Sequence, residues 1–267
     1  MSKETKIMGI LNVTPDSFFD SFNYSDISSD KNQKILDDLS YADFIDVGGE
    51  SSRPGAVPVS VDEEIKRIEL ILPFLDRFKD KELSIDTYNH KTAEFALSNS
   101  FNIVNDITGG ENYKMLELVS NYNSKIILMH MKGTPQNMQN APKYDNIIDE
   151  IINFFEIRIS QALKCGISED NIIIDPGIGF GKTVEHNNTI IKNFEKFKVL
   201  NFPLLLGISR KSFLSYKDDK VNDRLGQTLA VTSYLIHKGI DYIRVHDVFE
   251  TRKMLTILNG IFSNRTE

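Results

Sequence analysis

Short hydrophobic runs alternate with longer amphipathic segments along the chain. The short runs are rich in Ile, Leu and Val, and most end in polar residues, which is typical of strands buried in a parallel sheet. Three consecutive isoleucines at residues 172–174, followed by Asp175 and Pro176, are the clearest example. Eight such strands are predicted, over residues 6–14, 44–47, 82–85, 103–107, 125–131, 172–174, 203–208 and 242–245.

The segments between these strands have helical periodicity. After Ser60, a predicted N-cap whose capping box is completed by Glu63, apolar side chains recur on one helical face. That face is predicted to lie in the core, and it consists of Val61, Ile65, Ile68, Leu72 and Leu75. Other helices are predicted over residues 30–41, 91–99, 111–122, 144–164, 185–199 and 222–238, with a last helix ending near residue 261.

A strand followed by a helix, repeated about eight times, requires a parallel sheet. In a chain of 267 residues this order predicts an α/β fold, a (β/α)8 TIM barrel, with residues 1–267 forming a single domain. A doubly wound open sheet is the alternative. In a barrel the active site is expected where the strands end at their carboxyl side.

Composition narrows the function classes. The chain is 40% hydrophobic and carries a net charge of -7, so a nucleic-acid or membrane-surface partner is not expected. Cys165 is the only cysteine, which excludes an intrachain disulfide and a zinc site built on several cysteines. The first residues contain no apolar run of the length of a signal peptide or membrane span. A soluble cytoplasmic protein is the prediction.

The segment IIIDPGIGFGK at residues 172–182 contains a glycine-rich loop that is not a nucleotide signature. A P-loop would need glycine where Pro176 stands, and the dinucleotide fingerprint needs a different glycine spacing. Polar residues follow the other predicted strands as well. Together, the candidates at the strand ends are Asn12, residues 48–53, Asp86, Asn105, Asp175, Lys211, Arg244 and His246.

These candidates divide into two groups. Asp86, Asn105 and Asp175 offer acceptors and one amide donor, which suits the amino-pyrimidinone edge of a guanine or pterin. The second group suits an anion, because a barrel's usual phosphate site follows strands seven and eight; it consists of Arg53, Lys211, Arg244 and His246, together with Asn12. The pattern predicts a pocket for a flat heterocycle with a phosphorylated arm.

Eight motifs, in one order along nearly the whole chain, resemble the dihydropteroate synthase family. They are GILNVTPDSF (9–18), DVGGESSRPG (46–55), SIDT (84–87), NDI (105–107), LMHMKGTPQNM (128–138), DPGIGFGK (175–182), SRKSF (209–213) and RVHD (244–247). SRKSF and RVHD also separate this family from the pterin-dependent methyltransferases. The resemblance implies that a dihydropterin hydroxymethyl pyrophosphate condenses with p-aminobenzoate, by an S_N1-like route, in folate biosynthesis.

The resemblance also implies roles for individual residues. Asp86, Asn105, Asp175 and Lys211 would hold the pterin, with Met129 lining its pocket. Arg244 would stack on the ring and reach the pyrophosphate beside His246, and Asn12 would bind Mg²⁺. Two loops and the p-aminobenzoate end complete the site; they would comprise Asp16, Phe18 and Asp20, then Ser52, Arg53 and Pro54, then Phe180, Lys211 and Ser212. The expected catalytic residues are Asp86, Asp175, Lys211, Arg244, His246 and Arg53. A homodimer through the last helices is implied too.

The chain departs from the family pattern in its first loop. Where the family often has Ser-Asp-Gly-Gly, this sequence has Phe19, Asp20, Ser21 and Phe22, which should affect p-aminobenzoate affinity and sulfonamide sensitivity. Ser52 replaces a frequent threonine and keeps the hydroxyl. A pterin-binding paralogue without catalysis and a pterin-dependent methyltransferase are the alternative functions.

Three other residues are expected to have structural roles. His130 follows the fifth predicted strand, and we expect a packed, hydrogen-bonded histidine rather than a base. Lys182 and Thr183 are expected in a structural loop.

Overall fold

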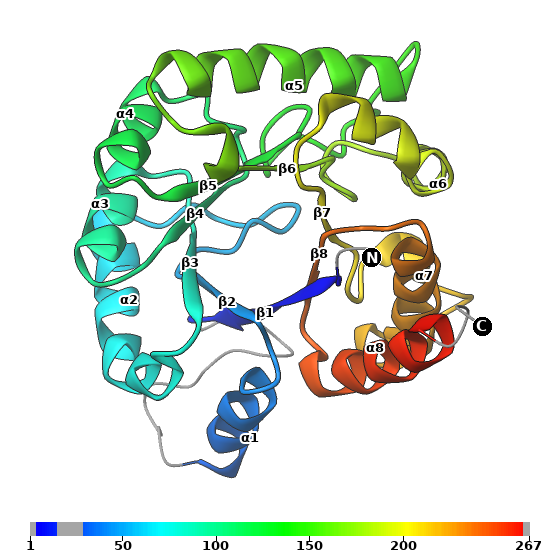
Figure 1. Cartoon of the computed structure of the whole chain (residues 1–267), viewed down its shortest axis with the longest axis horizontal. Coiled ribbons are helices and arrows are strands. Elements are labelled where there is room, and N and C mark those ends of the chain that lie inside the picture. The colour runs from blue at the N-terminus through cyan, green and yellow to red at the C-terminus, as the bar shows by residue number, and fades with distance from the viewer. Residues whose placement is uncertain (1–3, 15–28, 264–267) are drawn as a thin grey trace.

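Eight parallel strands form the centre of the computed structural model, which describes residues 4–14 and 29–263 (Figure 1). They are paired in the order β6-β5-β4-β3-β2-β1-β8-β7. Their bounds are β1 (Lys6–Asn12), β2 (Phe44–Gly48), β3 (Glu82–Asp86), β4 (Ile103–Asp106), β5 (Lys125–Met129), β6 (Ile172–Asp175), β7 (Leu205–Gly207) and β8 (Tyr242–Val245).

The two edge strands of this sheet meet. A parallel bridge joins Ile174, in β6, to Leu204, which precedes β7, and the Ile174 N–H donates to the Pro203 carbonyl at 3.0 Å. The sheet is therefore a barrel, which confirms the predicted TIM-barrel fold and excludes the open sheet.

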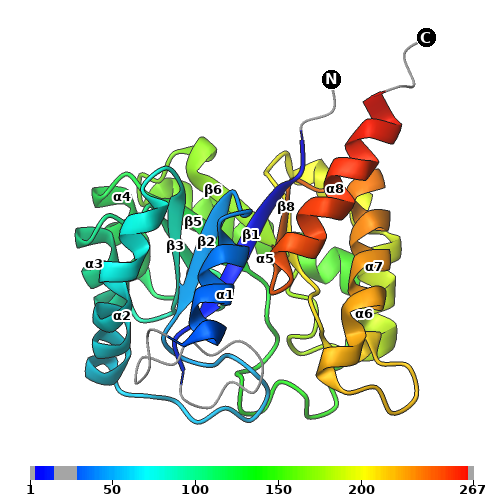
Figure 2. The same ribbon diagram turned by 90° about the horizontal axis from the view of Figure 1, so that it is seen from below.

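Helices surround the barrel (Figures 1 and 2). The α-helices are α1 (Asp30–Leu39), α2 (Val61–Leu75), α3 (His90–Ser98), α4 (Tyr113–Asn121), α5 (Ile147–Lys164), α6 (Val184–Lys192), α7 (Leu225–His237) and α8 (Val248–Ser263). The segments that follow β2 and β5 lie together at the lower end of the barrel in Figure 2, where the Gly55 N–H donates to the Pro135 carbonyl at 3.0 Å. Among the residues that the structure describes, no helix has both the length and the apolar character needed to cross a bilayer.

Three predicted helices differ from the observed elements. The predicted helix over residues 185–199 becomes α6 and a 3-10 helix, Phe194–Leu200, separated at Asn193. The helix predicted over residues 222–238 begins as a 3-10 helix, Val221–Arg224, before α7. Helix α5 starts at Ile147 because the Asn146 side chain accepts from the next turn's N–H groups.

The predicted core face of α2 was partly wrong. Ser60 caps the helix by accepting from the Glu63 N–H, as predicted, but the Glu63 carboxylate pairs with Arg67 at 2.9 Å. The buried positions are Glu64, Ile68, Ile71 and Leu75, whereas Val61, Ile65 and Leu72 are half-buried. Apolar spacing could not indicate a buried glutamate. Glu64 is held by hydrogen bonds from Thr92 at 2.6 Å and Asn89 at 3.4 Å.

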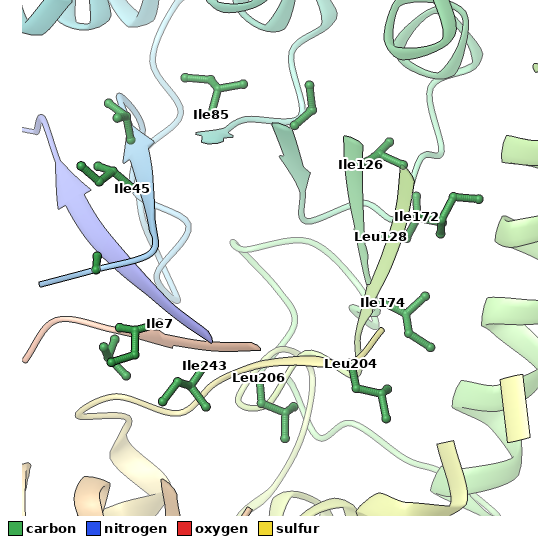
Figure 3. Close-up of a cluster of buried hydrophobic side chains, with 14 of the residues drawn as sticks. Ile7, Ile45, Ile85, Ile126, Leu128, Ile172, Ile174, Leu204, Leu206 and Ile243 are labelled. Atoms are coloured by element: carbon green, nitrogen blue, oxygen red, sulfur yellow. The ribbon is translucent and has the colours of Figure 1, made fainter. Parts of the chain in front are cut away.

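Two layers of apolar side chains hold the barrel. The outer layer lies between the strands and the helices; in Figure 3 it includes Ile7, Ile45, Ile85, Ile126, Leu128, Ile172, Ile174, Leu204, Leu206 and Ile243. A second cluster comes from strand positions of the opposite alternation and comprises Met8, Phe44, Ile103, Ile127, Ile173, Leu205 and Tyr242. Because side chains alternate along a strand, the residues two positions after this inner cluster also face inward, and many of them are polar.

Candidate active site

Inward-facing polar residues meet at the carboxyl ends of the strands. Strand pairing places Asp86 opposite Asn105, Met129 opposite Asp175 and Asn12 opposite Gly48. Asn105, Met129 and Asp175 are each at most 6% exposed. The structure therefore brings together the residues predicted from the strand ends, although their individual roles remain predictions.

Arg244 joins two of the acidic residues. Its Nε donates to Asp46 Oδ2 at 2.6 Å, and its NH2 group donates to Asp86 Oδ2 at 2.6 Å. Asn105 Nδ2 also donates to Asp46 Oδ2, at 3.1 Å. Arg244 was predicted among the anion-binding residues, and in this structure its guanidinium is ion-paired with Asp46 and Asp86.

Asp46 was not among the site residues predicted from the sequence. It is fully buried in β2, and its second oxygen, Oδ1, has no hydrogen-bond partner in the described part of the chain. The signal was present in the sequence, because Asp46 is a carboxylate within a buried strand and two positions from Gly48, which ends it. Alternation along β2 places it inside the barrel with Phe44.

Two carboxylates that share one guanidinium cannot both be fully neutralised. Burial raises the pKa of Asp86 to about 7, Arg244 opposes that rise, and Asp46 adds to it. Burial disfavours the charge of Arg244, but Asp46 and Asp86 outweigh burial and raise its pKa. The ionised Asp86 is therefore costly in the free protein, and a ligand N–H group would offset that cost.

We expect Asp86→Asn to stabilise the free protein at pH 8 by about 1–3 kcal/mol and to give no gain near pH 4. The folded-state pKa of Asp86, about 7, lies above its ordinary value, so the cost of ionisation appears as pH rises from about 4 through 7. Asparagine removes that cost. Urea unfolding of both proteins at the two pH values measures the difference, and equal or lower stability of the variant at pH 8 would contradict the account.

Asp175 and Lys211 form the opposite wall. Asp175 Oδ1 accepts from the Gly177 N–H at 2.8 Å, and burial raises the pKa of Asp175 while Lys211 opposes the rise. Lys211 Nζ donates to the Ile178 carbonyl and lies 4.5 Å from the centre of the Phe180 ring. Burial lowers the pKa of Lys211 to about 8, against the attraction of Asp175. Lys211 thus lies against the loop after β6, next to Asp175.

His246 lies in a positively charged surrounding. Its Nδ1 and its backbone nitrogen are each 3.2 Å from Ser209 Oγ. Burial, followed by the charges of Arg244 and Arg53 and then of neighbouring basic residues, lowers the pKa of His246 to about 3. The imidazole is therefore neutral at pH 7. An anion is the ligand that such a cluster of positive charges favours.

The loops after β7 and β8 are joined by a buried ion pair. Arg210 donates to both carboxylate oxygens of Asp247, at 2.8 Å and 2.5 Å. Arg210 immediately precedes Lys211, and Asp247 immediately follows His246. Neither residue was predicted from the sequence to have a role, and the ion pair between them fixes the positions of Lys211 and His246.

The predicted loop residues lie at the rim. Ser52 is half-buried, Arg53 and Pro54 are exposed, and Ser212 is exposed at the start of a 3-10 helix, Ser212–Leu214. Phe18, Asp16 and Asp20, and with them the unusual residues of the first loop, lie outside the described residues.

The surroundings of Asn12 are compatible with its predicted role as a Mg²⁺ ligand. It is half-buried, and its Oδ1 lies 3.7 Å from the point that a Cβ on Gly48 would occupy, near Asp86. Residues 4–14 and 29–263 contain no cluster of three or more His, Cys, Asp or Glu suited to a metal ion. Mg²⁺ at phosphate sites commonly takes few protein oxygens and completes its shell with phosphate and water. One amide oxygen beside a rim that is predicted to bind phosphate fits that use.

His130 and Thr183 have the expected structural roles. His130 is 6% exposed, its ring packs edge-on against Phe154, and burial lowers its pKa to about 2. Thr183 caps α6 in a reciprocal capping box with His186.

Comparisons with known proteins agree with this geometry. The family described as "Pterin binding enzyme" matches residues 8–246. Dihydropteroate synthase of Clostridium beijerinckii is 42% identical over 257 residues, which cover 95% of this chain and 93% of that protein.

Two solved structures are similar over almost the whole chain. Dihydropteroate synthase of Yersinia pestis, in a sulfonamide drug complex, superposes with a TM-score of 0.91 at 34% identity, covering 97% of this chain and 95% of that one. The enzyme of Anaplasma phagocytophilum, with bound 6-hydroxymethylpterin-monophosphate, gives 0.85 at 34% identity, covering 96% and 99%. The chain therefore belongs to the pterin-binding enzyme family and, within it, to the dihydropteroate synthases.

Proposed function

We propose that this chain condenses 6-hydroxymethyl-7,8-dihydropterin pyrophosphate with p-aminobenzoate to give 7,8-dihydropteroate and pyrophosphate. The observation that carries the proposal is a group of acceptors inside the barrel, the buried Asp46, Asn105 and Asp175 with the half-buried Asp86, next to a rim of positive charge. Related proteins that bear the name of this activity have the same fold, and one holds a pterin phosphate.

The pterin would lie across the acidic floor. Asp175 would accept the N–H groups of its amino-pyrimidinone edge, and Asp86 and Asn105 would bond to the other edge. Asp46 orients Asn105 and Arg244 through hydrogen bonds of 3.1 Å and 2.6 Å, so it would act through these two residues. Met129, opposite Asp175 in the β5–β6 pair, would contact the ring face.

The pyrophosphate would lie at the rim beside Arg244, His246, Arg53 and Asn12. His246 is neutral, so it can donate one hydrogen bond without adding to the repulsion among the basic groups. Mg²⁺, when bound through Asn12, would supply positive charge to the leaving group. Arg244 lies between the pterin region and the pyrophosphate region. To reach the substrate, its guanidinium would give up part of its hydrogen bonding to Asp46 and Asp86.

The reaction that we propose for this arrangement is S_N1-like. The bond between the pterin methylene and the pyrophosphate oxygen breaks first, and the electron pair leaves with pyrophosphate. The amine nitrogen of p-aminobenzoate then bonds to the methylene carbon and loses a proton to solvent. Asp175, aligned by the Gly177 N–H, would stabilise positive charge on the ring, and the basic rim would stabilise the leaving group.

The p-aminobenzoate end would be formed by Phe180, Lys211 and Ser212, with Ser52, Arg53 and Pro54 at its rim. Phe180 and Lys211 are already in contact, whereas Ser212 and Arg53 are exposed at the rim. The Yersinia pestis relative was solved with a sulfonamide drug, and we propose that this chain binds sulfonamides at the same end. Phe18 and the altered first loop would tune that affinity.

Assembly, domain organisation and location complete the proposal. A homodimer would use α7 and α8, whose exposed apolar side chains include Tyr234, Ile257 and Ile261. We propose that the chain functions as one domain in the cytoplasm, with small-molecule substrates as its ligands.

The proposal is tested by product identity. Purified protein, dihydropterin pyrophosphate, p-aminobenzoate and Mg²⁺ should form 7,8-dihydropteroate, detected by mass spectrometry, and a sulfonamide should compete with p-aminobenzoate. Pterin binding without product would indicate the paralogue without catalysis. Transfer of a methyl group from a methylated pterin to a corrinoid would indicate the methyltransferase.

A further inference from the structure

Lys182 is a buried amine with three acceptors. Its side chain is almost fully buried, and its Nζ lies 2.9 Å from His130 Nδ1, 2.9 Å from the Phe180 carbonyl and 3.2 Å from the His130 carbonyl. An ammonium group has three donors, so each one can be matched with an acceptor. Burying an amine is costly, and an uncharged side chain of similar length would fill the same space without that cost. The hydrogen bonds of the amine are therefore what distinguishes lysine at this position.

The loop that Lys182 supports is held at every carbonyl. Four consecutive carbonyls, from Ile178 to Gly181, each accept from a different side chain of another part of the fold or from Lys182. The donors, in order, are Lys211, Gln139 at 2.6 Å, Lys182 at 2.9 Å and Tyr144 at 2.9 Å. A loop held this way has little freedom to shift the side chain that it carries.

Glycines press the same loop against the chain after β5. Gly177 and Gly181 have positive φ angles of 69° and 63°. A Cβ at Gly177 would lie 1.9 Å from the His130 carbonyl oxygen, and one at Gly181 would lie 2.3 Å from the Lys132 carbonyl oxygen. Backbone approaches of this kind leave no room for side chains at these glycines. The loop therefore packs against residues 130–132 in one arrangement.

Phe180 is the side chain that this support fixes. Its carbonyl accepts from Lys182, and its ring faces the Lys211 ammonium at 4.5 Å, next to Asp175. A cation at this distance from an aromatic ring stabilises one orientation of both groups. Phe180 therefore presents a fixed face toward the side of the site proposed for the aromatic amine.

We propose that Lys182 is a positioning residue for p-aminobenzoate: it locks the backbone of Phe180 onto His130 and so sets the wall that the aromatic amine contacts. This inference rests on the proposed function. Among the described residues Lys182 makes no hydrogen bond to Asp175 and acts on it only through charge, whereas it bonds directly to the Phe180 carbonyl, so its loss should affect the second substrate more than the first.

The groups around Lys182 are consistent with a positioning role. Burial lowers the pKa of Lys182, Asp175 opposes that shift and Lys211 adds to it. Burial and Lys182 together lower the pKa of His130, so the imidazole stays neutral and its Nδ1 acts as the acceptor. Neither the Lys182 amine nor the His130 imidazole is therefore placed to donate a proton to a substrate.

Two substitutions and one control test the proposal. Lys182→Met removes the three donors and keeps an unbranched side chain that is one atom shorter. Tyr144→Phe removes only the hydrogen bond to the Gly181 carbonyl and keeps the ring contacts with His130 and Lys132. Lys192→Met changes an exposed lysine on α6. KM for each substrate and kcat are measured for all three and for the wild type.

We expect Lys182→Met to raise KM for p-aminobenzoate at least about tenfold, which corresponds to about 1.4 kcal/mol, with KM for the pterin changed less than about twofold. Tyr144→Phe should cause a smaller shift in the same direction, and Lys192→Met none. Unchanged KM for p-aminobenzoate in both loop variants, or an equal rise for both substrates, would overturn the inference; if Lys182→Met does not fold, Tyr144→Phe decides. A wild-type protein without turnover would instead refute the proposed function, and the inference with it.

Discussion

Asp175→Asn should lower turnover by about 100-fold or more and leave the free energy of unfolding within about 1 kcal/mol of the wild type. Asp175 is buried at the end of β6 and aligned by the Gly177 N–H at 2.8 Å. Asparagine has the same shape, and its Oδ1 can keep that hydrogen bond. It cannot carry the negative charge that would stabilise the cation forming on the pterin.

The stability of this variant follows from the sign of the pKa shift. Burial raises the pKa of Asp175 and Lys211 opposes the rise, so asparagine removes both the cost of burying a charge and the attraction to Lys211, and these two effects on stability oppose each other. Steady-state kinetics and urea unfolding are measured together. Asp170→Asn, an exposed change before the same strand, is the matched control. Near-normal turnover in Asp175→Asn would contradict the role of the charge.

Arg244→Met should lower the free energy of unfolding by about 3–5 kcal/mol and abolish measurable turnover. The guanidinium is the ion-pair partner of Asp46, which is fully buried, and of Asp86, each at 2.6 Å. Without it, two neighbouring buried carboxylates repel each other. Urea unfolding at pH 8 measures the loss.

A triple variant separates stability from catalysis. Adding Asp46→Asn and Asp86→Asn to Arg244→Met should restore most of the lost stability, because the unpaired charges are gone, while turnover stays absent. Arg252→Met breaks a more exposed ion pair with Asp43, at 2.7 Å, and should cost less than about 1 kcal/mol. A loss for Arg244→Met no greater than that of this control would contradict the account of the ion-pair network.

Much of the barrel could be predicted from local patterns. A buried parallel strand needs an apolar run, and the chain shows that run eight times, so the strands and their order were predicted correctly. Asp86 and Asp175 end their strands and Asn105 lies one residue before the end of β4, so each stood out in the sequence as a polar residue after an apolar run, and their roles stay predictions. The helix boundaries were less accurate, since they depend on capping contacts such as the one at Asn193.

The remaining features depend on contacts between distant segments. Asp46 lies within a strand, and a fully buried carboxylate there is explained by its contacts with Arg244, 198 residues away, and with Asn105, 59 residues away. Glu64 interrupts the apolar face of α2 because two residues from another segment donate hydrogen bonds to its carboxylate. They are Thr92, in α3, and Asn89, which immediately precedes α3. Lys182 was assigned to a structural loop, and no sequence pattern could show that its amine bonds to Phe180 and His130.

The rate of pyrophosphate release from dihydropterin pyrophosphate with Mg²⁺, measured with and without p-aminobenzoate, tests the central claim most directly. The account predicts release that depends on p-aminobenzoate and matches the dihydropteroate formed. Pterin binding without release would contradict the catalytic claim. Absence of pterin binding would contradict the assignment of Asp86, Asn105 and Asp175 as the pterin site.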